Sequence, residues 1–429
     1  MIKKESRNPW AWIPSLYLAE GLPYVVVMFV SVIMYKRLGI SNTEIALYTS
    51  WLYLPWVIKP LWSPFVDLLK TKRIWILISQ LFIGTGLAGV AFTIPVAEFF
   101  QYTLAFFWLM AFSSATYDIA ADGFYMLGLS KHHQAFFVGV RSTFYRIAFL
   151  AGQGLLVILA GQIEESSGDI AYAWAITFFI LSGLFILLFI YHFIVLPHPK
   201  ADSKRSDVTT GKFIKNFIET FSAFFKKKSI LLILGFILLY RFGEAQLVKL
   251  ASPFLLDPIE TGGLALTTSQ VGFVYGTVGV IALSVGGILG GFAAAKNGLK
   301  FWIWWMLIAM NIPNLVYVYL AVTQTTNFLL INAAVAVEQF GYGFGFTAFI
   351  LYLIYISEGE FKTAHYAIAT GFMALGMMLP GMISGWIQEQ IGYQQFFIWV
   401  CISTIPAFII TKFISIDPKF GKKTPVDKS

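Results

Sequence analysis

Twelve long apolar segments in a chain of 429 residues constrain the fold more than any other feature. Each has about 20 residues or more, the length that a helix needs to cross a hydrocarbon core of roughly 30 Å. Charged residues make up only 12% of the chain, too few to cover the surface of a soluble domain. These features predict an all-α membrane protein and exclude a soluble enzyme. The predicted spans cover residues 10–34, 44–64, 74–94, 101–129, 135–162, 171–196, 229–252, 269–295, 301–323, 327–357, 364–389 and 395–414.

The distribution of Lys and Arg orients these spans across the bilayer. With the N-terminus inside, the inner loops, the tails and the inner end of the last span together hold 23 of the 30 basic residues, and the outer loops hold two, Lys36 and Arg37. Cytoplasmic loops carry such an excess, so both termini are predicted to be cytoplasmic. The formal charge of +8 therefore reflects topology. No nucleic-acid partner is expected, because no basic patch is interleaved with aromatic residues as in single-strand binders.

The longest inner loop divides the chain into two sets of six spans. We expect an N-terminal six-helix half over residues 1–196, a cytoplasmic linker over 197–228, a C-terminal six-helix half over 229–414 and a cytoplasmic tail over 415–429. Phenylalanines at helical spacing among lysines in the linker predict an amphipathic helix on the inner membrane surface; a cytosolic extension of the seventh span is the alternative. Twelve spans split in this way resemble the layout of major-facilitator transporters. The phenylalanines are Phe213, Phe217, Phe221, Phe224 and Phe225.

Ionisable residues at membrane depth are energetically costly and indicate a functional site by default. Acidic residues near mid-depth occur on the first, fourth, seventh and tenth spans, so they recur every third helix. Nested three-helix repeats, with the first helix of each lining a central cavity, would give this period. The intramembrane charges are Glu20, Lys59, Asp118, Asp122, Arg141, Arg146, Arg241, Glu244, Lys249 and Glu338.

The fourth and fifth spans form a hairpin with a tight inner turn at residues 131–134. Asp122 and Arg141 each lie about two helical turns from it, and Asp118 and Arg146 about three. Two ion pairs, Asp122 with Arg141 and Asp118 with Arg146, are therefore expected. The pairs would either fix the register of the hairpin or form a site for protons or substrate.

Glu20 and Glu338 lie near mid-membrane, and neither has a basic neighbour within its own span. A carboxyl in such surroundings is favoured in its protonated form, which suits proton coupling; a neutral carboxyl in a helix contact is the alternative. Glycines follow both acids, at residue 21 and at residues 341, 343 and 345, and we expect the helices to be loosened or broken there. Proton coupling is therefore predicted for Asp118, Asp122, Glu338 and Glu20.

Arg241 is a candidate ligand for a substrate carboxylate or phosphate, because a guanidinium binds such groups through two donors. Its alternative partner is Glu244, three residues along the same predicted helix. Lys249 and Lys59 lie near span ends, from which a lysine can extend to the interface. The predicted substrate-binding residues are Arg146, Arg141, Arg241, Glu244, Tyr24, Tyr117, Tyr145 and Tyr342, with Tyr352 a further candidate, although packing is the alternative role of each tyrosine.

The inner turn between the second and third spans reads Trp62-Ser63-Pro64-Phe65-Val66-Asp67 and is followed by Lys72-Arg73. It resembles the major-facilitator loop motif, in which an acid and basic residues hold the cytoplasmic side shut. The acid can face the positive N-terminus of a neighbouring helix. We expect a cytoplasmic gate formed by Asp67, Lys72, Arg73 and Lys59.

Three runs together resemble the peptide/acetyl-CoA transporter branch of the major facilitators, which includes the AmpG-type muropeptide permeases. They are Lys59-Pro60-Leu61-Trp62-Ser63-Pro64 with Asp67, Tyr117-Asp118-Ile119-Ala120-Ala121-Asp122-Gly123 and Ala19-Glu20-Gly21-Leu22-Pro23. The resemblance implies the major-facilitator fold and a proton-driven importer of anhydro-muropeptides in the bacterial inner (cytoplasmic) membrane. Acyl-CoA, siderophore and drug-like substrates remain alternatives.

No enzymatic activity, cofactor or metal site is predicted. The single cysteine, Cys401, cannot build a thiolate metal site. The histidines lie near predicted inner loops without a His-Asp spacing, which argues against a membrane acyltransferase. A multidrug exporter of the same fold would have a mostly apolar cavity with few acids. The expected partners are a small-molecule substrate, protons and the lipid bilayer, and the chain is expected to be monomeric. The histidines are His132, His133, His192, His198 and His365.

Overall fold

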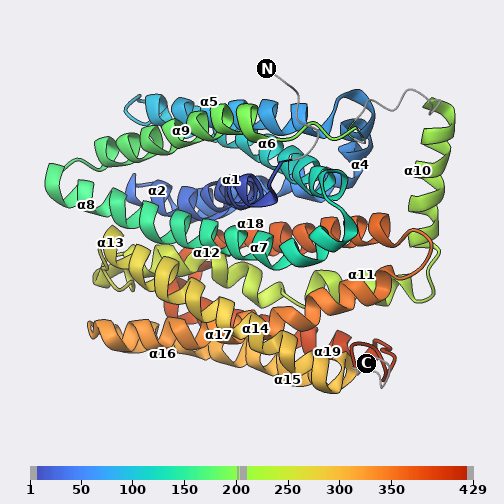
Figure 1. Cartoon of the computed structure of the whole chain (residues 1–429). Coiled ribbons are helices and arrows are strands. Elements are labelled where there is room, and N and C mark those ends of the chain that lie inside the picture. Colours follow the sequence, from blue (N-terminus) through green and yellow to red (C-terminus); the bar gives the residue numbers. More distant parts are fainter. Residues whose placement is uncertain (1–6, 201, 203–209, 423–429) are drawn as a thin grey trace. The chain divides into compact units, whose positions relative to one another are not determined.

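The computed structural model describes residues 7–200, 202 and 210–422 of the chain, except for the side chains of residues 67, 68, 131, 135 and 210–216. These described residues form helices joined by short connections and contain no strand (Figure 1). Ten helical stretches among them are long and apolar enough to cross a membrane. The all-α fold predicted from the sequence is therefore confirmed.

The first six predicted spans correspond to helices α1 to α9. Three of these spans are interrupted: the first and fifth contain a turn of π-helix, and the second is broken at residues 52–53. The elements are η1 (Pro9–Ala11), α1 (Ile13–Val25), η2 (Val26–Val30) and α2 (Ser31–Arg37), then α3 (Asn42–Trp51), α4 (Leu54–Leu69), α5 (Lys72–Thr93), α6 (Phe99–Gly128), α7 (Lys131–Phe149), η3 (Leu150–Leu156), α8 (Val157–Ser167) and α9 (Ile170–Val195).

The last six predicted spans correspond to helices α11 to α19. The eleventh and twelfth form one long helical stretch that turns at Gly392, where φ is +75°, a conformation that favours glycine. The elements are α11 (Ile230–Leu239), α12 (Phe242–Leu256), η4 (Ile259–Thr261), α13 (Thr268–Val271), η5 (Gly272–Gly279), α14 (Val280–Asn297), α15 (Leu299–Asn311), η6 (Ile312–Asn314), α16 (Leu315–Thr323), α17 (Phe328–Ser357), α18 (Lys362–Ser403) and α19 (Ile405–Phe413). All twelve predicted spans are therefore helical.

The helix expected in the linker is present as α10 (Thr210–Phe225), and in Figure 1 it runs crosswise to α11, α15 and α19 of its own unit. The positive φ of Ser229, +61°, separates it from α11, so it is not an extension of the seventh span. Phe224 is fully buried and packs against Phe372, with ring centroids 6.4 Å apart. One phenylalanine of the predicted apolar face therefore packs on protein, and contact of this helix with the membrane stays a prediction.

The chain forms two compact units. Unit 1 comprises residues 1–39, 58–208 and 267–276, and unit 2 comprises residues 40–57, 209–266 and 277–429. Unit 1 thus contains α13 from the C-terminal part of the chain, and unit 2 contains α3 from the N-terminal part. The predicted division of the chain into halves at residues 196 and 229 stays a prediction.

Residues 40–57, the exchanged segment that contains α3 and belongs to unit 2, pack closely on α18. The amide nitrogen of Asn42 donates hydrogen bonds to Gln388 Oε1 at 2.7 Å and to the hydroxyl of Tyr393 at 2.9 Å. A Cβ atom on Gly385 would lie 1.9 Å from the carbonyl oxygen of Asn42, so the two helices are in backbone contact. Only glycine permits this approach.

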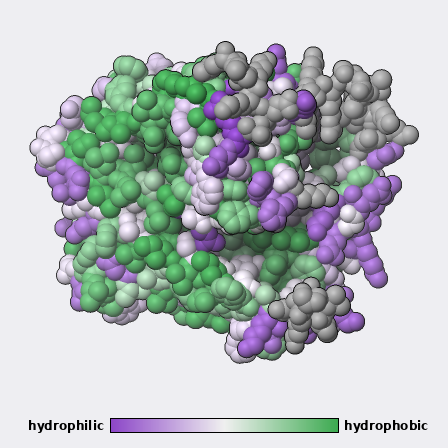
Figure 2. Space-filling model, in the orientation of Figure 1, coloured by the Kyte–Doolittle hydropathy of each residue, from purple (hydrophilic) through white to green (hydrophobic). Residues whose placement is uncertain are grey.

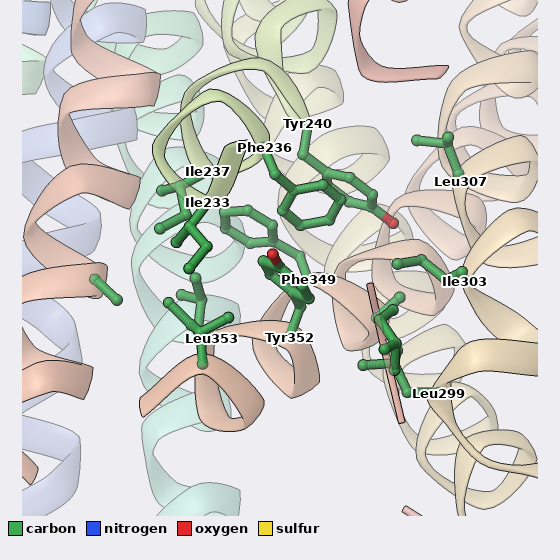
Figure 3. Packing of buried hydrophobic residues seen from close by; sticks show 14 of the residues in the cluster. Ile233, Phe236, Ile237, Tyr240, Leu299, Ile303, Leu307, Phe349, Tyr352 and Leu353 are labelled. Carbon is green, nitrogen blue, oxygen red and sulfur yellow. The ribbon is translucent and has the colours of Figure 1, made fainter. Parts of the chain in front are cut away.

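The core of unit 2 contains a cluster of aromatic and aliphatic side chains, shown in Figure 3. Tyr240 stacks on Phe349 with ring centroids 5.2 Å apart, and its hydroxyl donates to the carbonyl oxygen of Gly345 at 3.1 Å. Large hydrophobic side chains such as Phe92, 68% exposed, and Leu231, 81% exposed, lie on the outside of the spans. Figure 2 shows hydrophobic residues over the spans and hydrophilic ones at the end where α10 lies, as expected for surfaces that face lipid and water.

The glycines after Glu338 do not break the tenth span, contrary to expectation. Helix α17 is continuous from Phe328 to Ser357. Its glycines instead permit close helix contacts: a Cβ atom on Gly341 would lie 2.1 Å from the carbonyl oxygen of Ala309, and one on Gly343 would lie 2.0 Å from that of Leu283. The interruptions occur in neighbouring spans, at residues 240–241 of the seventh and at η6 of the ninth.

Candidate functional site

Unit 1 gathers five charged side chains from four helices, which we call the unit 1 charge cluster: Glu20 of α1, Lys59 of α4, Asp118 and Asp122 of α6, and Arg141 of α7. Asp118 and Asp122 are four residues apart, so an uninterrupted α6 presents both on one face. The α1 and α7 helices pack against each other, which brings Glu20 and Arg141 to the same place.

Asp122 and Arg141 form the ion pair that the sequence predicts, with Nη2 of Arg141 2.9 Å from Oδ1 of Asp122. The hydroxyl of Tyr17 donates to the same carboxylate oxygen at 3.2 Å. The guanidinium of Arg141 also lies over the rings of Tyr17 and Tyr125, 4.7 and 5.2 Å from their centroids. Two aromatic rings and a carboxylate therefore orient this arginine.

Asp118 forms an ion pair with Lys59, and this corrects the prediction that Arg146 is its partner. Lys59 also does not extend to the interface as predicted, because its ammonium group points to α6. Arg146 is exposed on α7. The depth of each residue in the hairpin follows from residue counting, but the rotation of α7 about its axis and the approach of α4 do not.

Glu20 is 7% exposed and completes the cluster. Its carboxyl interacts electrostatically with Asp118, Asp122 and Arg141 and is close enough to Asp118 for a direct hydrogen bond. Two carboxyl groups in contact need a proton between them, because two carboxylates repel each other. With three carboxyl groups and two basic groups, the cluster is neutral when it holds one proton.

Unit 2 holds a second polar cluster near the interruption of the seventh span. Arg241 lies outside regular helix, and its guanidinium donates to the hydroxyl of Tyr342 and stacks on the ring of Phe346, with a centroid distance of 4.8 Å. Glu244 is fully buried, and neither of its carboxyl oxygens has a hydrogen-bond partner among the residues that the structure describes. Glu244 and Arg241, which could have paired within one helix, interact electrostatically without a hydrogen bond between their described side chains, because the helix breaks at Arg241.

Glu338 is 1% exposed in the middle of α17. It accepts hydrogen bonds from the side-chain amide of Gln339, at 3.0 and 3.3 Å, and the hydroxyl of Tyr317 faces it. It also interacts electrostatically with Glu244. The two acids of unit 2 are thus neighbours, as the two aspartates of unit 1 are.

Lys249 does not extend to the interface, contrary to prediction. It is 2% exposed, and its ammonium group donates to the hydroxyl of Thr49 at 3.0 Å and lies 5.3 Å from the ring centroid of Tyr53. All three residues belong to unit 2, so this lysine joins α12 to the exchanged segment that contains α3.

The predicted cytoplasmic gate residues are only partly within the described side chains. Asp67 lies outside them. The backbone N–H groups of Lys72 and Arg73 donate to the carboxylate of Asp202, at 2.7 and 3.1 Å. The side chain of Asp202 therefore caps the start of α5. The guanidinium of Arg73 donates to the carbonyl oxygen of Phe193 at 2.5 Å. A role of these residues in gating stays a prediction.

The candidate tyrosines fall into two groups. Tyr117 and Tyr352 are buried in packing contacts, since Tyr117 donates to the carbonyl oxygen of Leu16 at 3.0 Å and Tyr352 belongs to the core in Figure 3. The partly buried ones are Tyr24 and Tyr145, which flank Phe149, and Tyr342, which contacts Arg241. The partly buried group is better placed to reach a solute.

Two buried polar networks in unit 1 have no counterpart in the sequence analysis. Glu164, 8% exposed, accepts hydrogen bonds from Trp174 at 2.8 Å and Thr268 at 2.7 Å and pairs with Arg37 at 3.1 Å. His192, predicted near an inner loop, is fully buried and contacts Gln80 and Ser15, at 2.6 and 2.9 Å. The sequence gives no sign of either network, because its members are dispersed along the chain.

Relatives of the chain are membrane transporters. It is 23% identical to "Putative transporter AmpG 4" of Rickettsia conorii over 415 residues, which cover 93% of this chain and 95% of that protein. It is 25% identical to the anhydromuropeptide permease of Escherichia coli K12 over 360 residues, which cover 83% of this chain and 69% of the permease.

Solved structures agree on the fold. The nucleoside transporter NupG superimposes with a TM-score of 0.68 at 14% identity, covering 94% of this chain and 98% of that one. The xylose transporter XylE from E. coli, in an inward open conformation, gives 0.69 at 13% identity, covering 95% and 96%. The model of the Major Facilitator Superfamily matches residues 15–360. The chain is therefore a multi-pass membrane transporter of small molecules that belongs to the Major Facilitator Superfamily.

Proposed function

We propose that this transporter imports an anhydro-muropeptide or a related cell-wall fragment together with protons. The substrate class is supported by the similarity to an anhydromuropeptide permease and by the sequence runs that resemble that family. The corresponding location is the bacterial inner membrane, with both termini cytoplasmic. The transporter would act as a monomer by alternating access, in which residues 10–196 move against residues 229–414.

The unit 1 charge cluster is the observation that carries the proton-coupled part of the proposal. Its three carboxyl groups, Glu20, Asp118 and Asp122, face two basic groups, so one proton neutralises it. Gain and loss of that proton would change which carboxyl pairs with Lys59 or Arg141. A change of partners between helices α1, α4, α6 and α7 gives a physical means of coupling protonation to helix movement.

Arg146, Arg241 and Tyr342 are the proposed substrate contacts. Arginines suit the carboxylates of a muropeptide, because each guanidinium donates several hydrogen bonds in a planar arrangement. Tyr342 offers both a ring and a hydroxyl next to Arg241. Glu338 remains the proposed coupling carboxyl of unit 2.

Uptake of a labelled anhydro-muropeptide into proteoliposomes tests this function. We expect accumulation when the lumen is alkaline relative to the outside, and none when a protonophore is added. Unlabelled muropeptide should compete, whereas acyl-CoA, a siderophore and a hydrophobic dye should not. Competition by acyl-CoA alone, or extrusion of the dye without muropeptide uptake, would assign the transporter to one of the alternative substrates.

A further inference from the structure

Lys249 of α12 is a buried cation without a counter-ion among the residues that the structure describes. The residue is 2% exposed, and no described carboxylate forms an ion pair with its ammonium group or interacts with it electrostatically. Glu244 lies five residues earlier on the same helix, so its side chain is on a different face. An ammonium removed from water is costly unless a negative charge accompanies it. The uncompensated charge therefore points to a bound anion.

The contacts of Lys249 hold its amino group as a charged donor. Its Nζ atom donates to the hydroxyl oxygen of Thr49 at 3.0 Å, and this hydroxyl donates its own hydrogen to the carbonyl oxygen of Ile45 at 2.6 Å. The same Nζ atom lies 5.3 Å from the ring centroid of Tyr53, and the face of such a ring attracts a cation. Because an ammonium has more N–H donors than these two contacts use, one donor is available to a ligand.

Ser50, next to Thr49 in α3, supplies a second donor. It is fully buried, and its hydroxyl oxygen has no hydrogen-bond partner among the described residues. A serine or threonine within a helix can donate to the carbonyl oxygen one turn earlier, as Thr49 does, but Ser50 does not. Native proteins rarely leave a buried hydroxyl group unpaired. The hydroxyl of Ser50 is therefore also available to a ligand.

The two donors meet at Gly381 of α18. A Cβ atom on this glycine would lie 2.7 Å from the hydroxyl oxygen of Ser50 and 3.4 Å from Cγ of Lys249. Both side chains therefore border the same point, where the glycine itself has no side chain. Helices α3, α12 and α18 contact one another and belong to unit 2. An unpaired hydroxyl and an uncompensated ammonium thus reach one place from separate helices.

The chemistry of these donors selects a carboxylate. The positive charge excludes a metal ion, and the N–H and O–H groups require a ligand that accepts hydrogen bonds. An ionised carboxylate only accepts, and its two oxygens can receive one hydrogen bond from the ammonium and one from the hydroxyl. Its single charge neutralises Lys249, whereas a doubly charged phosphate would leave a negative charge buried.

We propose that Lys249 and Ser50 bind a carboxylate in unit 2, with Thr49 and Tyr53 as positioning residues for the ammonium. Both donors are buried in this structure, so the carboxylate enters in another conformation of α3, α12 and α18. That this carboxylate belongs to the transported solute rests on the proposed function, whereas the binding of a simple carboxylate does not.

Thermal unfolding of the purified full-length protein, followed by tryptophan fluorescence, tests the site with acetate as the probe. We expect the Tm of the wild type to rise saturably when sodium acetate replaces NaCl at constant pH and sodium concentration. Acetamide, which has the shape of acetate without its charge, should not raise the Tm. Lys249→Met should abolish the rise and Ser50→Ala should weaken it, while Lys300→Met, which changes an exposed lysine of unit 2, should keep it.

The Tm of Lys249→Met without acetate separates binding from a structural role. Removal of an uncompensated buried charge should leave the Tm unchanged or raise it, whereas loss of a structural anchor would lower it. A lower Tm of this variant, with no saturable response of the wild type to acetate, would overturn the proposal and show that Lys249 only joins α12 to α3. A saturable rise that Lys249→Met retains would also overturn it, because acetate would then bind elsewhere.

The wild type alone keeps the proposal testable if Lys249→Met does not fold. A saturable effect of acetate that acetamide does not share supports a charged site, and a linear effect of acetate, typical of a general salt effect, contradicts it. None of these measurements uses muropeptide uptake. The carboxylate site and the proposed function can therefore fail separately.

Discussion

Arg141 of α7 and Asp122 of α6 are joined by an ion pair of 2.9 Å. The arginine side chain is 28% exposed and the aspartate side chain 44% exposed, so water screens their attraction in part. The pair nevertheless links two helices that also carry the other charges of the unit 1 charge cluster. The strength of this ion pair therefore affects both the stability of unit 1 and its proposed coupling to protons.

A double-mutant cycle measures that strength. Asp122→Asn and Arg141→Gln each leave one charge without its partner, and we expect each to lower the thermal stability of the purified protein. The double variant should be more stable than the sum of the single effects predicts, by about 1 kcal/mol. Additive effects, as expected for the control combination of Arg141→Gln with Glu165→Gln, would show that the pair contributes no coupling energy.

Glu164 offers a second test, on the network that joins α8 to α9 and α13. Glu164→Gln removes the charge that pairs with Arg37 and weakens the hydrogen bonds from Trp174 and Thr268. We expect a loss of about 1.5–3 kcal/mol of stability, because hydrogen bonds to a buried charged group are strong. Glu165→Gln changes the exposed neighbour and should leave the Tm unchanged; equal melting of the two variants would refute the structural role of Glu164.

The close approach of α3 to α18 makes Gly385 sensitive to any side chain. Gly385→Ala places a methyl group 1.9 Å from the carbonyl oxygen of Asn42, and backbone cannot move aside as a flexible side chain does. We expect a cost of about 1–3 kcal/mol, seen as a lower Tm. Gly291→Ala, whose Cβ atom would meet no described residue within 4 Å, is the matched control. Equal stability of both variants would mean that the helices are not in contact.

The sequence predicts the helical architecture well, because each membrane-spanning helix needs a long run of apolar residues that can be recognised in the sequence. All twelve predicted spans are helical in the structure. Interruptions within spans are harder to predict. The glycines of α17 suggested a broken helix, but neighbouring backbones pack against them, whereas the break of the seventh span at Arg241 has no glycine or proline at that position.

The unit 1 charge cluster was predictable in part: the pair of Asp122 with Arg141 was predicted, and the pair of Asp118 with Lys59 was not. Depth along a helix follows from residue counting, which placed Asp122 level with Arg141. Pairing also depends on how each helix is rotated about its axis and on which third helix lies nearby. Asp118 pairs with Lys59 because α4 supplies a basic side chain at this position of α6. Lys249 and His192 were predicted near the interface, and both are buried, because contacts with distant segments enclose them.

The most direct test of the central claim is uptake of labelled anhydro-muropeptide into proteoliposomes under an imposed pH gradient, comparing wild type with Asp118→Asn. Removing this carboxylate leaves Lys59 without its ion-pair partner and Glu20 without the carboxyl that can share its proton. We predict that wild type and Glu165→Gln accumulate substrate in response to the gradient, and that Asp118→Asn, although folded by its Tm, retains only exchange that the gradient does not drive. Full gradient-driven uptake by Asp118→Asn would contradict proton coupling through the unit 1 charge cluster.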